Sequence, residues 1–281
     1  MSIDRISNAF KAAADSGRAA LIPYIAAGNP LRDSTVPLMH ALVKAGADVI
    51  ELGVPFSDPM ADGPIIQKAA EHAIAQGVGL KDVLSMVAEF RQTDTTTPIV
   101  LMGYANPIER LGQQLFTQQA AAAGVDGVLV VDYPPEEAHE FVGLLSEHDM
   151  APIFLLAPTS TEQRIAAVGQ LARGYVYYVS LRGVTGAGHL NVAEVATQLG
   201  TIKKHVTIPV GVGFGISDAQ SASQVAEVAD AVVIGSKLID VMTKAWQAVP
   251  QAQQTDAAVR AGHDWLASIR QALEKVVKQP A

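Results

Sequence analysis

The chain has 281 residues, 49% of them hydrophobic, which is enough to bury a large core in one domain or two small ones. Its formal net charge of −8, with scattered lysines and arginines, argues against nucleic acid or an anionic membrane surface as a partner. The absence of cysteine excludes a disulfide framework and thiolate chemistry, and fits a reducing cytoplasm, where we expect the protein.

The first predicted element is an amphipathic helix at the N-terminus. Apolar residues recur at Ile3, Ile6 and Phe10 with charges between them, which is typical of such a helix and not of a signal peptide. Farther along, no apolar run reaches the length of a membrane span. The sequence therefore predicts neither a signal peptide nor a transmembrane helix.

Eight short apolar runs follow, and each predicts a β-strand. They span residues 21–26, 48–53, 99–102, 126–131, 153–156, 175–180, 208–212 and 231–235. Segments with helical spacing separate them, and most runs start roughly 22 to 33 residues apart, close to one strand and one helix per step. The longer gap after the second run, about 50 residues, contains two predicted helices, 64–76 and 80–91.

Local signals predict where several helices begin and end. Two prolines and two glutamates at 134–137 predict the start of one helix, a capping box at 159–162 the start of the next, and residues 217–218 the start of another. Gly46 and Gly124 stand where helices turn back into strands, and glycine suits a helix C-terminus.

Eight strand–helix units in one chain of this length predict an α/β fold, a (β/α)8 TIM barrel formed by residues 1–281 as a single domain. The barrel would carry an extra N-terminal helix, an added helix in the loop after the second strand, and a terminal amphipathic helix that includes Trp265 and Val276. A doubly wound open sheet is the alternative. The sequence contains no linker or low-complexity stretch that would divide the chain.

A glutamate interrupts the second apolar run. Glu51 lies near the end of a predicted strand buried on both faces, and removal of a carboxylate from water raises its pKa. Glu51 can therefore hold a proton near neutral pH. Asp62, eleven residues later in a loop rich in glycine and proline, should stay wetter and ionised. Two acids in unlike surroundings can supply both a proton donor and an anion to one site.

Each acid also has a structural interpretation. Glu51 could be paired with an arginine from elsewhere in the chain, and Asp62 could merely shape the turn before Pro64. For Asp62 taken alone, this structural interpretation is plausible.

Other polar residues fall where predicted strands end, which is where barrels of this kind place their chemistry. They are Tyr104 and Asn106 after the third run, Asp132 after the fourth, Tyr177 in the sixth, and Thr185 in the loop after it. Tyr177 also fits a packed aromatic side chain, and Asp132 a helix start. The seven histidines are dispersed and no run contains lysine, so the sequence predicts neither a metal site nor a Schiff-base nucleophile.

Three glycine-rich segments follow the last three predicted strands, at 183–188, 211–216 and 235–238. Glycine lets backbone N–H groups approach an anion closely, and the N-terminus of a helix adds its dipole. Loops after the seventh and eighth strands bind phosphate in many such barrels. We therefore predict a phosphorylated ligand and not simply three tight turns.

Five motifs along nearly the whole chain, at 22–30, 51–64, 104–107, 183–186 and 213–216, resemble those of the tryptophan synthase α subunit family. The second motif is highly specific. The resemblance implies a carbon–carbon lyase of tryptophan biosynthesis, which cleaves indole-3-glycerol phosphate by a retro-aldol reaction to indole and D-glyceraldehyde 3-phosphate. It also implies that this chain needs no cofactor, and that a partner β subunit carries pyridoxal phosphate in an αββα heterotetramer.

The resemblance also implies residue roles. Glu51 would protonate C3 of indole and take up the glycerol hydroxyl proton, and Asp62 would hold the indole N–H. Tyr177 would help to position Glu51, and Thr185 would help to close the loop over Asp62. The indole pocket would be lined by Tyr24, Met102, Leu129, Leu155, Phe214 and Val233. The phosphate would be held by backbone amides at Gly186, Gly215, Gly235 and Ser236.

The sequence departs from the family pattern at two places. Leu181 precedes Arg182 where many members have an arginine directly after the strand serine, and Tyr24 stands where many have phenylalanine. These departures bear on loop closure and on the aromatic wall, and leave the two acids untouched. By the same resemblance, the β subunit would be contacted by Pro55, Phe56, Asp58, Asn106 and Pro134.

Two other functions stay open. The first is a phosphosugar isomerase or an indole-glycerol phosphate synthase on the same barrel. A lysine in a barrel strand would favour the synthase, and the predicted strands contain none. The second is a non-catalytic activator that only binds a partner. Loss of Glu51 or Asp62 would mark such an activator, and both are present.

Overall fold

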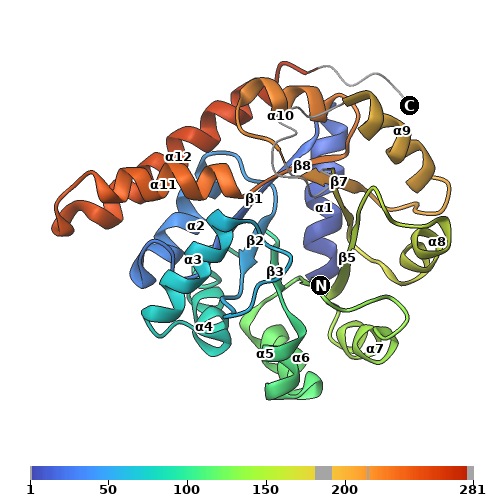
Figure 1. Cartoon of the computed structure of the whole chain (residues 1–281), viewed down its shortest axis with the longest axis horizontal. Helices are drawn as coiled ribbons and strands as arrows, with labels where there is room; N and C mark the ends of the chain where they lie inside the picture. The colour runs from blue at the N-terminus through green and yellow to red at the C-terminus, as the bar shows by residue number, and fades with distance from the viewer. Residues whose placement is uncertain (1, 181–191, 214, 277–281) are drawn as a thin grey trace.

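The predicted strands close into a parallel barrel. The computed structural model describes residues 2–180, 192–213 and 215–276, and within these ranges the eight strands pair in sequence order, with β1 also paired to β8 (Figure 1). The strands are β1 (Ala20–Ala26), β2 (Ile50–Gly53), β3 (Ile99–Gly103), β4 (Gly127–Val130), β5 (Ala151–Leu156), β6 (Val176–Val179), β7 (Val210–Gly213) and β8 (Ala231–Ile234). The TIM barrel is therefore confirmed, and the open-sheet alternative is wrong.

Helices surround the barrel, and both predicted additions are present. The helices are α1 (Ser2–Asp15), α2 (Thr35–Lys44), α3 (Pro64–Ala75), α4 (Leu80–Phe90), α5 (Ala105–Leu111), α6 (Gln113–Ala123), α7 (His139–Glu147), α8 (Glu162–Leu171), α9 (Val192–Ile202), α10 (Ala219–Ala226), α11 (Ser236–Gln247) and α12 (Gln254–Leu273). Both α3 and α4 lie between β2 and β3, as the long gap predicted. None of the helices in the described ranges has the length and apolar character needed to span a bilayer.

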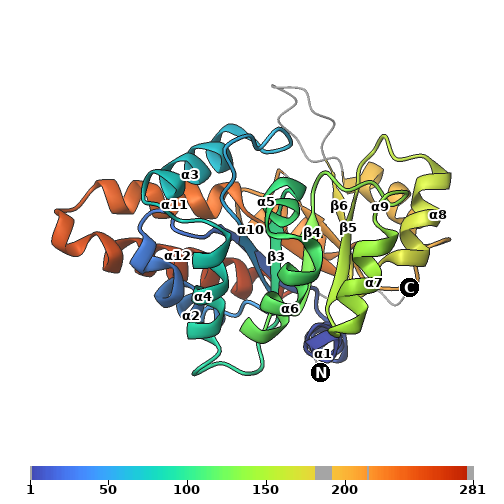
Figure 2. The ribbon, with the colours of Figure 1, turned by 90° about the horizontal axis from the view of Figure 1, so that it is seen from below.

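Helix α1 lies across one end of the barrel (Figure 2). Its buried Ile6 and Phe10 belong to the same apolar cluster as Val49 and Ala151, which stand at the starts of strands, and as Tyr175. The rings of Phe10 and Tyr175 are 5.5 Å apart. Burial of each such side chain contributes about 1.5–3 kcal/mol. Helix α1 thus closes the N-terminal end of the barrel, so a ligand can enter only from the C-terminal end.

Three acids directly before strands join those strands to their neighbours. Asp48, Asp126 and Asp230 precede β2, β4 and β8 at a distance of one or two residues. One carboxylate oxygen of each accepts a hydrogen bond of 2.8–2.9 Å from the first or second backbone N–H of the preceding strand of the barrel. The carboxylates are also paired with cations: Arg18 and Arg270 at Asp48, Arg5 and Arg91 at Asp126, and Lys203 at Asp230.

One predicted helix start is wrong, and a second is in the right place but lacks the predicted capping box. Residues 134–138 form turns, with bonds from Glu137 N to Pro134 O and from Ala138 N to Pro135 O, and α7 begins only at His139. Two successive prolines explain the delay, because a proline disfavours the helical region for the residue before it. Helix α8 is capped by Thr161, whose side chain accepts from the backbone N–H of Arg164, so residues 159–162 are not a capping box. The third start, at residues 217–218, is confirmed.

Candidate active site

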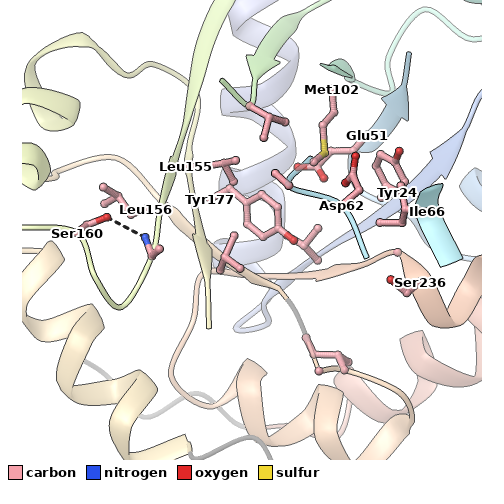
Figure 3. A pocket seen from close by; sticks show the side chains of 18 of the residues that line it. Tyr24, Glu51, Asp62, Ile66, Met102, Leu155, Leu156, Ser160, Tyr177 and Ser236 are labelled. Atoms are coloured by element: carbon pink, nitrogen blue, oxygen red, sulfur yellow. Dashed lines mark hydrogen bonds between the residues drawn. The ribbon is translucent and has the colours of Figure 1, made fainter. Parts of the chain in front are cut away.

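A cavity of about 670 Å³ lies at the C-terminal end of the barrel. It brings together ten of the residues singled out from the sequence, namely Tyr24, Glu51, Asp62, Met102, Leu155, Tyr177, Gly215, Val233, Gly235 and Ser236. Figure 3 shows Glu51, Asp62, Tyr24 and Met102 gathered on one side of Tyr177, with Leu156 and Ser160 on the other side. Three further predicted residues, Thr185, Gly186 and Phe214, lie outside the described residues.

Glu51, on β2, is a fully buried acid with one satisfied oxygen. The hydroxyl of Tyr175 donates to Oε1 at 2.5 Å, and Oε2 has no hydrogen-bond partner among the described residues. Burial raises the pKa of Glu51 to about 7, and the Tyr175 hydrogen bond opposes this rise. The predicted proton-holding acid is therefore present, and no arginine in the described ranges pairs with it. Its free oxygen is available to a ligand.

Asp62 lies in the loop after β2 and is only partly buried, as predicted. Its Oδ2 accepts a hydrogen bond of 2.9 Å from the hydroxyl of Tyr104, and that hydroxyl accepts one from the backbone N–H of Ala61 at 3.1 Å. Burial raises the pKa of Asp62, and the Tyr104 bond counters it. Tyr104, at the end of β3, therefore holds both the carboxylate and its loop in place.

The sequence singled out the wrong tyrosine as the partner of Glu51. Tyr177 lines the cavity, but the hydroxyl bonded to Glu51 is that of Tyr175. The two tyrosines are two residues apart on β6 and its entry, so both side chains point to the barrel interior. Burial raises the pKa of both phenols, so both are neutral hydrogen-bond donors.

Two tyrosines of the cavity lie directly over glycines of the next strand. A Cβ atom added at Gly53 on β2 would overlap the hydroxyl of Tyr24 on β1, and one at Gly213 on β7 would overlap that of Tyr177 on β6. Any larger residue would displace the tyrosine. The missing side chains therefore shape the wall that a ligand would contact.

Part of the cavity wall carries backbone donors. Gly235 is the N-cap of α11 and Ser236 its first residue, so free N–H groups and the positive end of the helix dipole lie there. Gly215 after β7 adopts a φ of 79°, which favours glycine. These features suit an anion such as phosphate. The described residues contain no group of three or more His, Asp or Glu side chains placed to bind a metal ion.

The structure changes the set of lining residues in two ways. Leu129 on β4 is fully buried in the barrel interior and is not in the cavity wall, where Val131 stands instead. Alternate residues of a strand face the same side, so Leu129 and Val131 both face inward, but the sequence does not show how deep each one lies. Sequence reasoning also missed two cations in the wall, Arg164 in the first turn of α8 and Lys237 in the first turn of α11.

Comparison with known proteins identifies the family. A family model described as "Tryptophan synthase alpha chain" matches residues 10–267. The chain belongs to the tryptophan synthase alpha chain family. The tryptophan synthase alpha chain of Bordetella bronchiseptica is 64% identical over 279 residues, which cover 99% of this chain and 98% of that relative. That of Cupriavidus taiwanensis is 59% identical over 97% of this chain and 100% of the relative.

Solved structures of the family share the fold. The tryptophan synthase subunit alpha of Legionella pneumophila str. Paris is 44% identical, with a TM-score of 0.88 over 97% of this chain and 99% of that one. A chain of tryptophan synthase from M. tuberculosis in an aminoacrylate-bound form is 33% identical, with a TM-score of 0.83 over 96% and 99% of the two chains.

Membership of the tryptophan synthase alpha chain family settles the reaction class. The family cleaves indole-3-glycerol phosphate, so this chain is a lyase of tryptophan biosynthesis. The hypotheses of a phosphosugar isomerase, an indole-glycerol phosphate synthase and a non-catalytic activator are therefore wrong. Membership also implies a β-subunit partner, and no cofactor in this subunit.

Proposed function

We propose that the cavity cleaves indole-3-glycerol phosphate with Glu51 as proton donor and acceptor and Asp62 as the anion beside the indole ring. The observation that carries this proposal is the state of Glu51, a fully buried acid whose pKa is raised to about 7 and whose Oε2 is unpaired. Such an acid exchanges a proton readily near neutral pH. Asp62 lines the same cavity.

In the proposed step, protonated Glu51 donates its proton to C3 of the indole ring. The ring then carries positive charge shared with its nitrogen, and it can accept the electron pair of the bond between C3 and the glycerol chain. As that bond breaks, the adjacent hydroxyl becomes the aldehyde of glyceraldehyde 3-phosphate, and its proton passes to the Glu51 carboxylate. Glu51 is thereby restored, and the ring leaves as neutral indole.

Asp62 would accept a hydrogen bond from the indole N–H and stabilise the cation as it forms. The Tyr104 hydroxyl at 2.9 Å supports this role, because it fixes the direction of the carboxylate. The partial burial of Asp62 supports it too, since a less polar environment strengthens the attraction between the two charges. Tyr24, Met102, Leu155, Tyr177, Phe214 and Val233 would enclose the ring, with Val131 in place of Leu129.

The backbone at Gly186, Gly215, Gly235 and Ser236 would hold the phosphate, and Thr185 would help to close the site over Asp62. The N-terminus of α11 supports this arrangement, because it supplies donors and a positive dipole end. With the phosphate at α11 and the ring N–H at Asp62, the glycerol chain would cross the cavity near Glu51.

The partner would be a β subunit that carries pyridoxal phosphate, in an αββα assembly in the cytoplasm, with this whole chain acting as one domain. Met60, in the loop after β2, is 81% exposed, and Phe56 in the same loop packs on Tyr104 with ring centroids 5.4 Å apart. A partner seated on that loop could therefore influence Asp62 through Tyr104. Pro55, Asp58, Asn106 and Pro134 would share the contact. Size-exclusion chromatography of the mixed subunits tests the assembly.

Glu51→Gln tests the function. Glutamine keeps the shape of the side chain but cannot transfer a proton, so we expect indole formation to fall by about a thousandfold, within the range for general acid–base catalysis. Circular dichroism should confirm that the variant is folded. Glu51→Asp is the matched control, because it keeps the carboxyl and should retain part of the activity. Turnover by Glu51→Gln within tenfold of the wild type would contradict the role.

A further inference from the structure

Two basic residues, Arg164 and Lys237, are among the described residues that line the cavity. Lys237 directly follows Gly235 and Ser236, the residues at the N-terminus of α11. It therefore places a positive charge beside backbone N–H groups that are themselves suited to an anion.

A lysine is an unusual choice at this position. The N-terminal turn of a helix carries positive partial charge, so a cation there is repelled, whereas an acid is favoured. The first turn of α11 contains no acid, and the lysine in its last turn, Lys244, lies where a cation is favoured. An anion bound beside Lys237 would offset this repulsion, because both the lysine and the positive end of the helix dipole would attract it.

Lys237 is paired with Asp240, and it can leave this partner without leaving the Asp240 carboxylate unpaired. Its Nζ lies 3.2 Å from Oδ2 of Asp240, and Nζ of Lys244 lies closer to the same oxygen, at 2.8 Å. Asp240 therefore keeps a cation if Lys237 turns away. The side chain of Lys237 is 38% exposed, so its ammonium group is not fixed by packing.

We propose that Lys237 is a substrate-binding residue that exchanges Asp240 for an oxygen of the substrate phosphate, and so favours phosphorylated ligands over neutral ones. This inference rests on the proposed phosphate subsite at Gly235 and Ser236. Arg164 does not share this placement, because it belongs to α8, after β5. Removal of Lys237 should therefore weaken phosphate binding, whereas removal of Arg164 should not.

Titration of the full chain with inorganic phosphate, glycerol 3-phosphate and indole tests the proposal. Lys237→Met keeps the apolar stem and removes the charge, and we expect it to bind the two phosphate compounds about tenfold more weakly, as for one charge-assisted hydrogen bond. Affinity for indole should not change. Lys237→Arg should retain most of the phosphate affinity. Arg164→Met is the matched control, since it removes the other positive charge at the cavity and should bind like the wild type.

Steady-state kinetics gives a second measurement. Lys237→Met should raise KM for indole-3-glycerol phosphate about tenfold with little change in kcat, and high salt should narrow the difference. Wild-type phosphate affinity in Lys237→Met would overturn the proposal, as would an equal loss of indole affinity or a loss found in Arg164→Met instead. Failure of the wild type to cleave the substrate would overturn the proposed function, whereas the phosphate titrations would still decide the role of Lys237.

Discussion

The two ends of the barrel each contain a fully buried acid, and the acids differ in how completely they are paired. Asp126, at the N-terminal end, accepts from Arg5 at 2.7 Å, from Arg91 at 2.6 Å and from the backbone N–H of Ile99 at 2.8 Å. Glu51, at the cavity, has one tyrosine hydroxyl on one oxygen and nothing on the other among the described residues.

Burial raises the pKa of both acids, but different groups oppose it. At Asp126 a backbone N–H and two guanidinium groups favour the charged form, whereas at Glu51 only the Tyr175 hydroxyl does so. A completely paired buried acid holds strands together, and an incompletely paired one can exchange a proton. Burial alone therefore does not distinguish the proposed catalytic acid from a structural one. The number of hydrogen-bond and ion-pair partners does.

Removal of a partner from Asp126 should give the largest loss of stability. Arg91→Met would leave a buried carboxylate with one guanidinium, and we expect the free energy of unfolding to fall by about 4 kcal/mol. Urea unfolding measures this, and the activity of the folded fraction should not change. The double variant Arg91→Met/Asp126→Asn should recover part of the loss. A loss below about 1 kcal/mol would show that the paired acid is not structural.

The stability of the chain should depend on pH through Glu51. The pKa of Glu51 rises on folding from an ordinary value near 4.5 to about 7, so the folded chain binds the extra proton between these values. The resulting stability is fully present below the lower value and is lost as the pH rises through the upper one, about 3 kcal/mol in all. Glu51→Gln cannot ionise, so urea unfolding should show it gaining on the wild type over this range. A constant difference would contradict the raised pKa.

Loss of the single partner of Glu51 should have a smaller effect. Tyr175→Phe removes a hydrogen bond that lowers the pKa of Glu51, so the pKa of Glu51 should rise. The limb of the pH–rate profile that reflects ionisation of Glu51 should then move to higher pH. We expect indole formation to slow about tenfold and stability to fall by about 1 kcal/mol. Tyr177→Phe is the control, because Tyr177 is not bonded to Glu51, and it should leave the limb in place. A shift in Tyr177→Phe alone would restore the role expected from the sequence.

The smallest effect should come from Asp230, the most exposed of the three acids that directly precede strands. Lys203, with a side chain 44% exposed, lies 3.3 Å from Asp230, whose side chain is 30% exposed. Solvent screens such a pair, so Lys203→Ala should cost at most about 0.5 kcal/mol in urea unfolding. A loss as large as that of Arg91→Met would mean that pairing matters at any depth.

The sequence predicted the barrel and both acids because each depends on a local pattern. Strands covered on both faces are continuous apolar runs, and a carboxylate inside such a run is conspicuous. All eight strands lie within two residues of their predicted bounds. Glu51 and Asp62 line one cavity because Glu51 lies on β2 and Asp62 lies in the loop directly after that strand.

The missed features depend on depth and direction, which a pattern of period two does not contain. Tyr175 and Tyr177 share one side of β6, and Val131 follows Leu129 on the same side of β4, so only coordinates decide which member of each pair reaches Glu51 or the cavity. Lys237 lies inside the glycine-rich segment 235–238 that the sequence linked to phosphate, but it was not singled out, because its contact with the cavity depends on where α11 begins.

The three acids that directly precede strands affect where the barrel can open locally. Asp48, Asp126 and Asp230 tie β1 to β2, β3 to β4 and β7 to β8, so three quarters of the wall consist of clamped doublets. The remaining doublet, β5 and β6, has Tyr175 where a clamp would stand. Local opening of the barrel should therefore be most frequent between β5 and β6. Because Tyr175 donates to Glu51, each such opening would also disturb the hydrogen bond that affects the protonation of Glu51.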